Sequence, residues 1–327
     1  MLRAAGDIGD ETLSLISPLG LIQRSQFFVE NTVWPVYVIL AQAVVVTAVA
    51  YALSAVRDID QGFISARPGK TEGARLLSSS SGLAYRLIRN FIFAWVIVLF
   101  CLGASYGTIL PDIEMFVDES EFYQMVIGAN SEYSHMEMFS ATINIIAAIF
   151  ALVPLLLIAL RPRTEEREGR TEQILAKPVS REKYLAGYIF PAFLVSILLQ
   201  LASVFGLYMA SVAFLDEPIS LTFLLQANLV FLPALWIMIG VAVFITGLLP
   251  RATTFVWAYF AFSFFTIFMG RMMDLPDWLP KLSPFGYIPQ LPVDDVNFST
   301  LIILTIVAFG LTLAGTIFYE RRDLVTA

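Results

Sequence analysis

Seven long apolar runs, none of which contains Asp, Glu, Lys or Arg, restrict the folds open to this chain of 327 residues. The hydrocarbon core of a bilayer is about 30 Å thick, and a helix needs about 20 apolar residues to cross it. Lipid chains cannot form hydrogen bonds with backbone N–H and C=O groups, so such runs are expected to be helical. With a mean hydropathy of +0.76, the sequence predicts an all-α polytopic membrane protein with about seven transmembrane helices. The runs are Val33–Ser54, Phe91–Leu110, Phe139–Leu160, Leu185–Phe214, Leu221–Leu249, Thr253–Gly270 and Phe298–Tyr319.

The distribution of basic residues predicts the orientation of these helices. Sixteen of the 20 Lys and Arg residues fall on one side of the predicted membrane, in the segments 55–89, 161–183, 250–252 and 320–327. Basic residues concentrate in cytoplasmic loops, so this side and the C terminus are expected to be cytosolic. Seventeen of the 27 Asp and Glu residues lie on the other side. The net charge of −7 is therefore mostly external, and we expect no nucleic-acid partner.

The segment 161–184 is a dense charged island with seven Lys or Arg and five Glu residues between two apolar runs. Thr164 can cap a helix whose first turn is acidic, which suits the positive end of the helix dipole. Pro178 would end that helix, because it cannot continue the hydrogen-bond ladder and it restricts Lys177. The pattern predicts a short cytosolic helix from Thr164 to Lys177. A merely solubilising charged loop is the alternative.

The order of signals in this segment resembles the coupling helix of ABC-2 type exporter permeases. The resemblance rests on Glu168-Gly169, Glu172, Ile174-Leu175-Ala176 and Pro178-Val179-Ser180-Arg181. It implies docking onto a separate ATPase subunit, with glutamates as contacts, a glycine that permits close approach and an arginine that anchors the return to the membrane. The residues expected in these roles are Glu165, Glu168, Gly169, Glu172 and Arg181. Solvation is the alternative for each charged one.

Further motifs resemble the tetronasin-resistance type of ABC permease, a group of polyketide-antibiotic exporters. They are Arg67-Pro68-Gly69, Gly82–Arg89, Ser283-Pro284-Phe285 and the ending Glu320–Leu324. The resemblance implies a six-span ABC-2 type transmembrane domain over 90–327, preceded by a cytosolic linker at 57–89. It also implies two cytosolic ATPase subunits that hold ATP and Mg, a chain that is not itself an enzyme, and export of hydrophobic or amphiphilic compounds through a prokaryotic plasma membrane.

Two pairs of short motifs recur about 265 residues apart and suggest an internal repeat. Ser17-Pro18 is echoed by Ser283-Pro284, and Arg57-Asp58 by Arg322-Asp323. Residues 1–56 would then be the tail of a first repeat. We expect either that the sequence is part of a longer two-copy permease, or that a companion permease supplies the missing helices.

The linker 57–89 ends in Gly82–Arg89, where Leu83 and Leu87 share one helical face and basic residues can reach lipid phosphates. This pattern predicts an amphipathic elbow along the inner leaflet. A plain basic flank is the alternative.

Several chemistries are excluded or disfavoured by residue types. Gly69-Lys70-Thr71 resembles the end of a phosphate-binding loop, but that pattern requires a glycine where Ile64 stands. His135 is the sole histidine and Cys101 the sole cysteine, which disfavours a metal site, an intramembrane catalytic centre or a resident cofactor.

Polar residues within the runs mark a candidate substrate path. Burying an amide without a partner is costly, so these side chains should face a cavity or another helix. Interhelical hydrogen bonding is the alternative. They are Asn144, Gln200, Gln226, Asn228 and Thr266. The absence of charge inside the runs disfavours an ion-coupled carrier and suits a hydrophobic cargo. A non-transport scaffold or sensor that binds a cytosolic partner through 161–184 is the alternative function.

Overall fold

The computed structural model describes residues 17–26, 31–56, 79–112, 135–269, 273, 275–276, 278–292 and 294–323. Within these ranges, all elements are helices. The chain divides into two compact units, Met1–Glu72 and Gly73–Ala327. This boundary falls inside the predicted linker 57–89. The landmark Arg57-Asp58 and the Gly69-Lys70-Thr71 motif lie outside the described residues.

The first unit contains helices α3 (Pro18–Arg24) and α4 (Trp34–Val56). Proline favours the first position of a helix, where its missing N–H costs nothing, and Pro18 begins α3 in this way. The apolar window of α4 is long enough to cross a membrane and is 0% buried within the described structure. A helix that is apolar on all sides suits a lipid environment.

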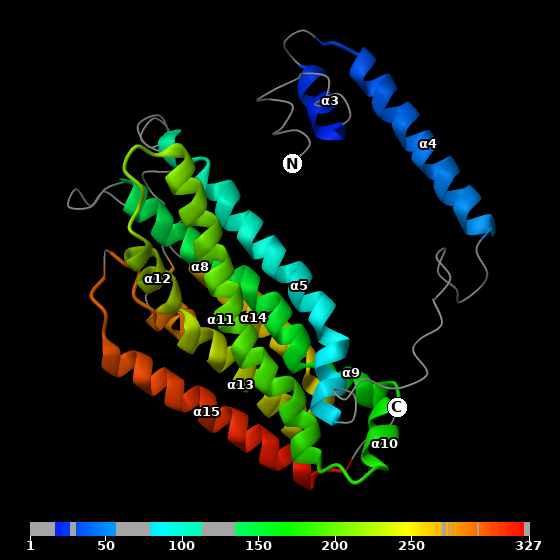
Figure 1. Cartoon of the computed structure of the whole chain (residues 1–327), viewed down its shortest axis with the longest axis vertical. Helices are drawn as coiled ribbons and strands as arrows, with labels where there is room; N and C mark the ends of the chain where they lie inside the picture. The colour runs from blue at the N-terminus through cyan, green and yellow to red at the C-terminus, as the bar shows by residue number, and fades with distance from the viewer. Residues whose placement is uncertain are drawn as a thin grey trace. The chain divides into compact units, whose positions relative to one another are not determined.

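The second unit is a bundle of helices around α8 (Figure 1). The window of α8 is 78% buried, and this helix packs against α5, α11 and α13. The elements of the bundle are α5 (Ser80–Gly107), α8 (His135–Ala159), α9 (Arg161–Arg167), α10 (Arg170–Leu175), α11 (Arg181–Phe214), α12 (Leu221–Leu229), α13 (Leu232–Leu248), α14 (Thr254–Met269) and α15 (Phe298–Arg321).

Six helical stretches in the described part of the chain are long and apolar enough to span a membrane. The seventh predicted span corresponds to α14, which has 16 residues. At 1.5 Å per residue it is about 24 Å long, less than the hydrocarbon thickness of about 30 Å. The all-α polytopic fold is therefore confirmed; Gly270, the last residue of the predicted seventh span, lies outside the described residues.

Two helix pairs pack with their backbones in contact. A Cβ atom added to Gly206 of α11 would lie 2.0 Å from the carbonyl oxygen of Phe100 on α5, and one added to Gly103 would lie 2.1 Å from that of Ser203. Between α13 and α15, a Cβ on Gly247 would lie 2.1 Å from the Gly315 oxygen. Small residues permit such close approach between membrane helices.

The predicted span Leu221–Leu249 is broken into α12 and α13. Pro233 is near the start of α13 and cannot donate the backbone hydrogen bond that a continuous helix requires. At the break, the N–H of Phe231 donates to the carbonyl of Asn228 at 3.1 Å. The predicted span is confirmed as one stretch of membrane-spanning length, Leu221–Leu248, with a short interruption between α12 and α13.

The predicted elbow, Gly82–Arg89, is part of a spanning helix in the structure. These residues form the first turns of α5, which runs without a break into the apolar span. Ser79 caps the helix, and its Oγ accepts from the N–H of Gly82 at 3.0 Å. The side that packs inward carries Gly82, Ala84 and Ile88, whereas Leu87 is exposed. Packing against α11, rather than the Leu83 and Leu87 face, sets the direction of this segment.

Candidate functional site

The charged island folds into a hairpin of two short helices, α9 and α10, here called the hairpin (161–178). The N–H groups of Arg163 and Thr164 donate to the Leu160 carbonyl at 3.1 and 3.3 Å, so the hairpin begins directly from the end of α8. Gly169, with φ of 70°, separates the two helices because this left-handed conformation cannot continue a helix and favours glycine. The prediction of a single helix capped by Thr164 was wrong.

Glu165 holds the two helices of the hairpin together. It is 2% exposed, and its carboxylate accepts from Arg161 Nε at 2.7 Å and from Arg170 Nε at 2.5 Å. Arg170 also pairs with Glu168. The hydrogen bond that Arg170 donates to Glu165 is the largest cause that raises the pKa of Arg170 above its ordinary value. Glu165 was predicted to contact a partner, but its buried carboxylate instead binds two arginines of the same hairpin.

A second buried carboxylate connects the hairpin to the far end of the chain. Glu166 is 1% exposed, and it accepts two hydrogen bonds from Arg322, with Nη1 at 2.8 Å and Nη2 at 2.6 Å. Arg163 lies 3.6 Å from the same carboxylate. The Arg322 guanidinium also stacks 4.7 Å from the centre of the Tyr319 ring. Sequence reasoning noted Arg322 as a repeat landmark and as part of the ending Glu320–Leu324, and it placed Glu166 in the acidic first turn of the predicted helix; it did not pair the two.

Arg181 lies at the start of α11 and bonds to the end of α15. Its Nη1 donates to the carbonyls of Glu320 at 3.0 Å and Arg322 at 2.5 Å. The last carbonyls of a helix lack partners within the helix, and basic side chains can satisfy them. The predicted anchoring residue therefore connects α11 to α15.

The remaining predicted contacts lie on the hairpin surface. Glu172 is exposed on α10, and the Glu168 side chain is 49% exposed. The hydroxyl groups of Thr171 and Tyr184 are 3.0 Å apart and join α10 to α11. The hairpin thus presents acidic side chains outward from a base held by buried ion pairs.

Three of the five predicted path residues converge inside the bundle. Asn144 of α8, Gln200 of α11 and Asn228 of α12 are each at most 1% exposed. Asn228 Nδ2 donates to Asn144 Oδ1 at 3.1 Å, and Gln200 Nε2 donates to the Asn228 carbonyl at 3.3 Å. This amide cluster bonds α8 and α11 to α12, which is the interhelical arrangement that the sequence left open.

The other two path residues lie apart from the cluster. Gln226 is exposed. Thr266 is 1% exposed, and its hydroxyl donates to the Phe262 carbonyl of its own helix at 3.0 Å. The structure therefore does not bring the five residues together as one path.

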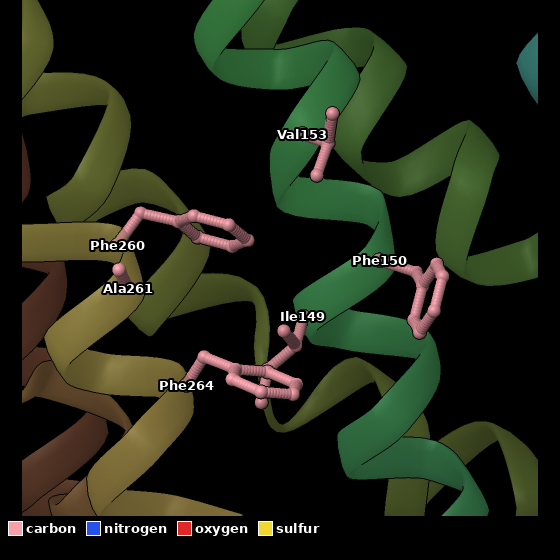
Figure 2. A pocket seen from close by; sticks show the side chains of 6 residues that line it. All are labelled: Ile149, Phe150, Val153, Phe260, Ala261 and Phe264. Atoms are coloured by element: carbon pink, nitrogen blue, oxygen red, sulfur yellow. The ribbon is translucent and has the colours of Figure 1, made fainter. Parts of the chain in front are cut away.

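An apolar groove between α8 and α14 is a feature that sequence reasoning missed. It has a volume of about 230 Å³. In Figure 2, Phe260 and Phe264 point from α14 toward α8. Its lining is entirely apolar and consists of Ile149, Phe150, Val153, Phe260, Ala261 and Phe264. The aromatic content of α14 was the available signal, but the sequence could not show which helix it faces.

No group of three His, Cys, Asp or Glu side chains that could hold a metal ion occurs among the described residues. Cys101 is a partly buried free thiol on α5. Among the described residues, charged side chains converge at Glu165 and Glu166 of the hairpin, where they form ion pairs.

The bundle of spanning helices and its charged hairpin define the class of this protein as an all-α, multi-pass membrane domain. Residues 77–320 match the family described as the C-terminal domain of the multidrug efflux system permease Rv1217c. The chain belongs to this family. The match begins before residue 90, so it includes the start of α5 as well as residues 90–320 of the predicted six-span domain.

A curated relative is the multidrug efflux system permease protein Rv1217c of Mycobacterium tuberculosis (strain ATCC 25618 / H37Rv). It is 31% identical over 328 residues, which cover 98% of this chain and 59% of the relative. The chain thus spans little more than half the length of this relative. The resemblance to an exporter permease is confirmed at the level of this family, and the narrower tetronasin-resistance type stays a prediction.

Proposed function

We propose that this chain forms the permease part of an ATP-driven exporter that moves hydrophobic or amphiphilic compounds out of a prokaryotic cell. Two cytosolic ATPase subunits would bind ATP and Mg, and the hairpin would dock onto one of them. The relative's name, a multidrug efflux system permease, supports the transport role. A companion half, on the same or another chain, would complete the pathway.

The observation that carries this proposal is the construction of the hairpin. The buried carboxylate of Glu165 pairs with Arg161 and Arg170 and keeps α9 and α10 in a fixed arrangement. Outside this base, Glu168 and Glu172 remain accessible to a partner. Such a preorganised surface loses little conformational entropy when it binds.

The hairpin is also placed to transmit movement. Its first helix continues from α8, and its second is bonded to α11 through Thr171 and Tyr184. ATP-driven movement of a docked subunit would therefore displace both helices. Rigid-body displacement of packed helices is a common form of switching transition.

The groove between α8 and α14 supports a hydrophobic cargo. Its six lining residues are aliphatic or aromatic, so a charged or strongly polar compound would lose its hydration there without compensation. Within the proposed exporter, this groove is where an apolar compound would contact the chain.

The proposal is tested by purifying the full-length protein from its native membrane with a tag at Ala327 and assaying the ATPase that accompanies it. Replacing Glu168 and Glu172 with Lys should weaken the association about tenfold, since the reversed charges would repel an ATPase surface that is complementary to the glutamates. Glu217→Lys is the matched control, because Glu217 is exposed beyond the other end of α11. Equal ATPase recovery with all variants would contradict docking through the hairpin.

A scaffold or sensor that uses the hairpin would also retain a partner. Export distinguishes the two functions. In sealed inverted vesicles, a transporter should accumulate a lipophilic dye when ATP is added. Partner binding without ATP-dependent accumulation would favour the scaffold.

A further inference from the structure

The geometry points to the Glu166–Arg322 pair as the link through which the hairpin moves the α13–α15 pair, a role that rests on the proposed exporter function. Both side chains are largely buried, with 1% of Glu166 and 12% of Arg322 exposed. They are 156 positions apart in the sequence. The contact therefore joins the hairpin to a helix that has no covalent connection near it.

The Glu166–Arg322 ion pair has a fixed geometry. Two parallel hydrogen bonds fix the guanidinium against the carboxylate, and bidentate Arg–carboxylate pairs add geometric specificity to their strength. Tyr319 lies under the same guanidinium. A displacement of α9 must therefore either carry Arg322 with it or break a buried ion pair, which is strongly unfavourable.

The end of α15 is also bonded to a second element, helix α11. Arg181, at the start of α11, donates to the carbonyls of Glu320 and Arg322. Arg322 thus contributes its side chain to α9 and its backbone to α11. The hairpin helix α9 and the helix that follows the hairpin, α11, are therefore bonded to the same turn at the end of α15.

Movement of α15 would extend to α13, because these helices are in backbone contact. A Cβ atom on Gly315 would lie 2.6 Å from the Phe244 nitrogen, and one on Gly240 would lie 2.7 Å from the Ala308 oxygen. Interfaces this close transmit displacement with little compression. The hairpin therefore acts on two pairs of elements: α8 and α11 directly, and α13 and α15 through Glu166 and Arg322.

The test compares export with ATP hydrolysis in vesicles that hold the full-length permease and its ATPase. The variant is Glu166→Gln combined with Arg322→Gln, which removes both charges of this pair; Arg163→Gln, which removes the other arginine near the Glu166 carboxylate, is made alongside it and should leave export per ATP unchanged. We expect ATP hydrolysis to be retained while dye export per ATP falls about tenfold, within the range typical of coupling between sites. Arg321→Gln is the matched control, because Arg321 is the exposed neighbour on the same helix.

Unchanged export per ATP in the double variant would overturn the inference. So would a double variant that fails to give a monodisperse folded protein, since the pair would then determine the fold rather than transmit movement. Loss of coupling in Arg321→Gln as well would also overturn it, because the effect would follow charge at the helix end instead of the pair.

A distance measurement separates this inference from the proposed function if the wild type shows no ATP-driven export. Spin labels at Gln173→Cys on α10 and Glu320→Cys on α15, in a Cys101→Ser background, report the position of α15 relative to the hairpin. We expect a narrow distance distribution in the parent and in Arg321→Gln, and a broad one in the double variant. Equal distributions in all three would show that the pair does not hold the two elements together.

Discussion

The second unit contains two kinds of helix contact that differ in what fills the space between the backbones. In the α5–α11 and α13–α15 pairs, glycines allow backbone atoms to touch, and no added side-chain atom would fit. Between α8 and α14, aromatic and aliphatic side chains face one another and leave a groove of about 230 Å³. The first kind restricts helices to one arrangement, whereas the second leaves room for a ligand.

The largest effect is expected from a side chain placed in a backbone contact. Gly206→Val would put Cβ 2.0 Å from the Phe100 carbonyl oxygen, and backbone atoms cannot move aside as a flexible side chain can. We expect a loss of about 3 kcal/mol of stability, typical of severe overpacking, seen as a lower thermal midpoint in detergent. Gly310→Val is the control, since no described atom lies within 4 Å of a Cβ there. Equal midpoints for both variants would contradict the backbone contact.

An effect of intermediate size on stability is expected in the amide cluster. There, hydrogen bonds of side chains, rather than contacts between backbones, join the helices. Asn228→Leu removes the hydrogen bond to Asn144. Such bonds between membrane helices contribute about 1 kcal/mol, so the midpoint should fall less than in Gly206→Val. Gln226→Leu, at an exposed site on the same helix, should leave it unchanged. A loss of similar size in Gln226→Leu would mean that the cluster is not what stabilises this junction.

The smallest effect on stability is expected from filling the groove. Ala261→Phe adds volume where space exists, so the midpoint should change by no more than about 0.5 kcal/mol, as at sites away from packed features. Export of a lipophilic dye should nevertheless fall, because the groove is occupied. Ala258→Phe is the control at an exposed position of α14 outside the groove lining. Destabilisation as large as that of Gly206→Val would show that α8 and α14 are as closely packed as the glycine pairs.

The contrast also explains which sequence predictions succeeded. Apolar runs located the spans because crossing a bilayer depends mainly on length and hydrophobicity, both of which are local. The interruption before Pro233 was not anticipated. Continuous hydrophobicity does not reveal where the hydrogen bonds of a helix are interrupted.

The structure separates exposed from buried residues among those predicted to contact a partner. Glu168 and Glu172 lie at the hairpin surface, as their sequence pattern suggested. Glu165 was assigned the same role, but it points inward to two arginines. Glutamates of one short charged segment look alike in sequence, and only the packing of the hairpin against its neighbours distinguishes the buried from the exposed ones.

The sequence by itself determined that this is an all-α, multi-pass membrane protein with a charged segment between two spans, because periodicity, charge and hydrophobicity act along the chain. The tertiary structure alone decided that Glu166 meets Arg322, that Asn144 meets Asn228, and that α8 and α14 enclose a groove. Each of these contacts joins residues that are distant in sequence. These contacts depend on how the helices pack, and no local sequence pattern indicates which residues will meet.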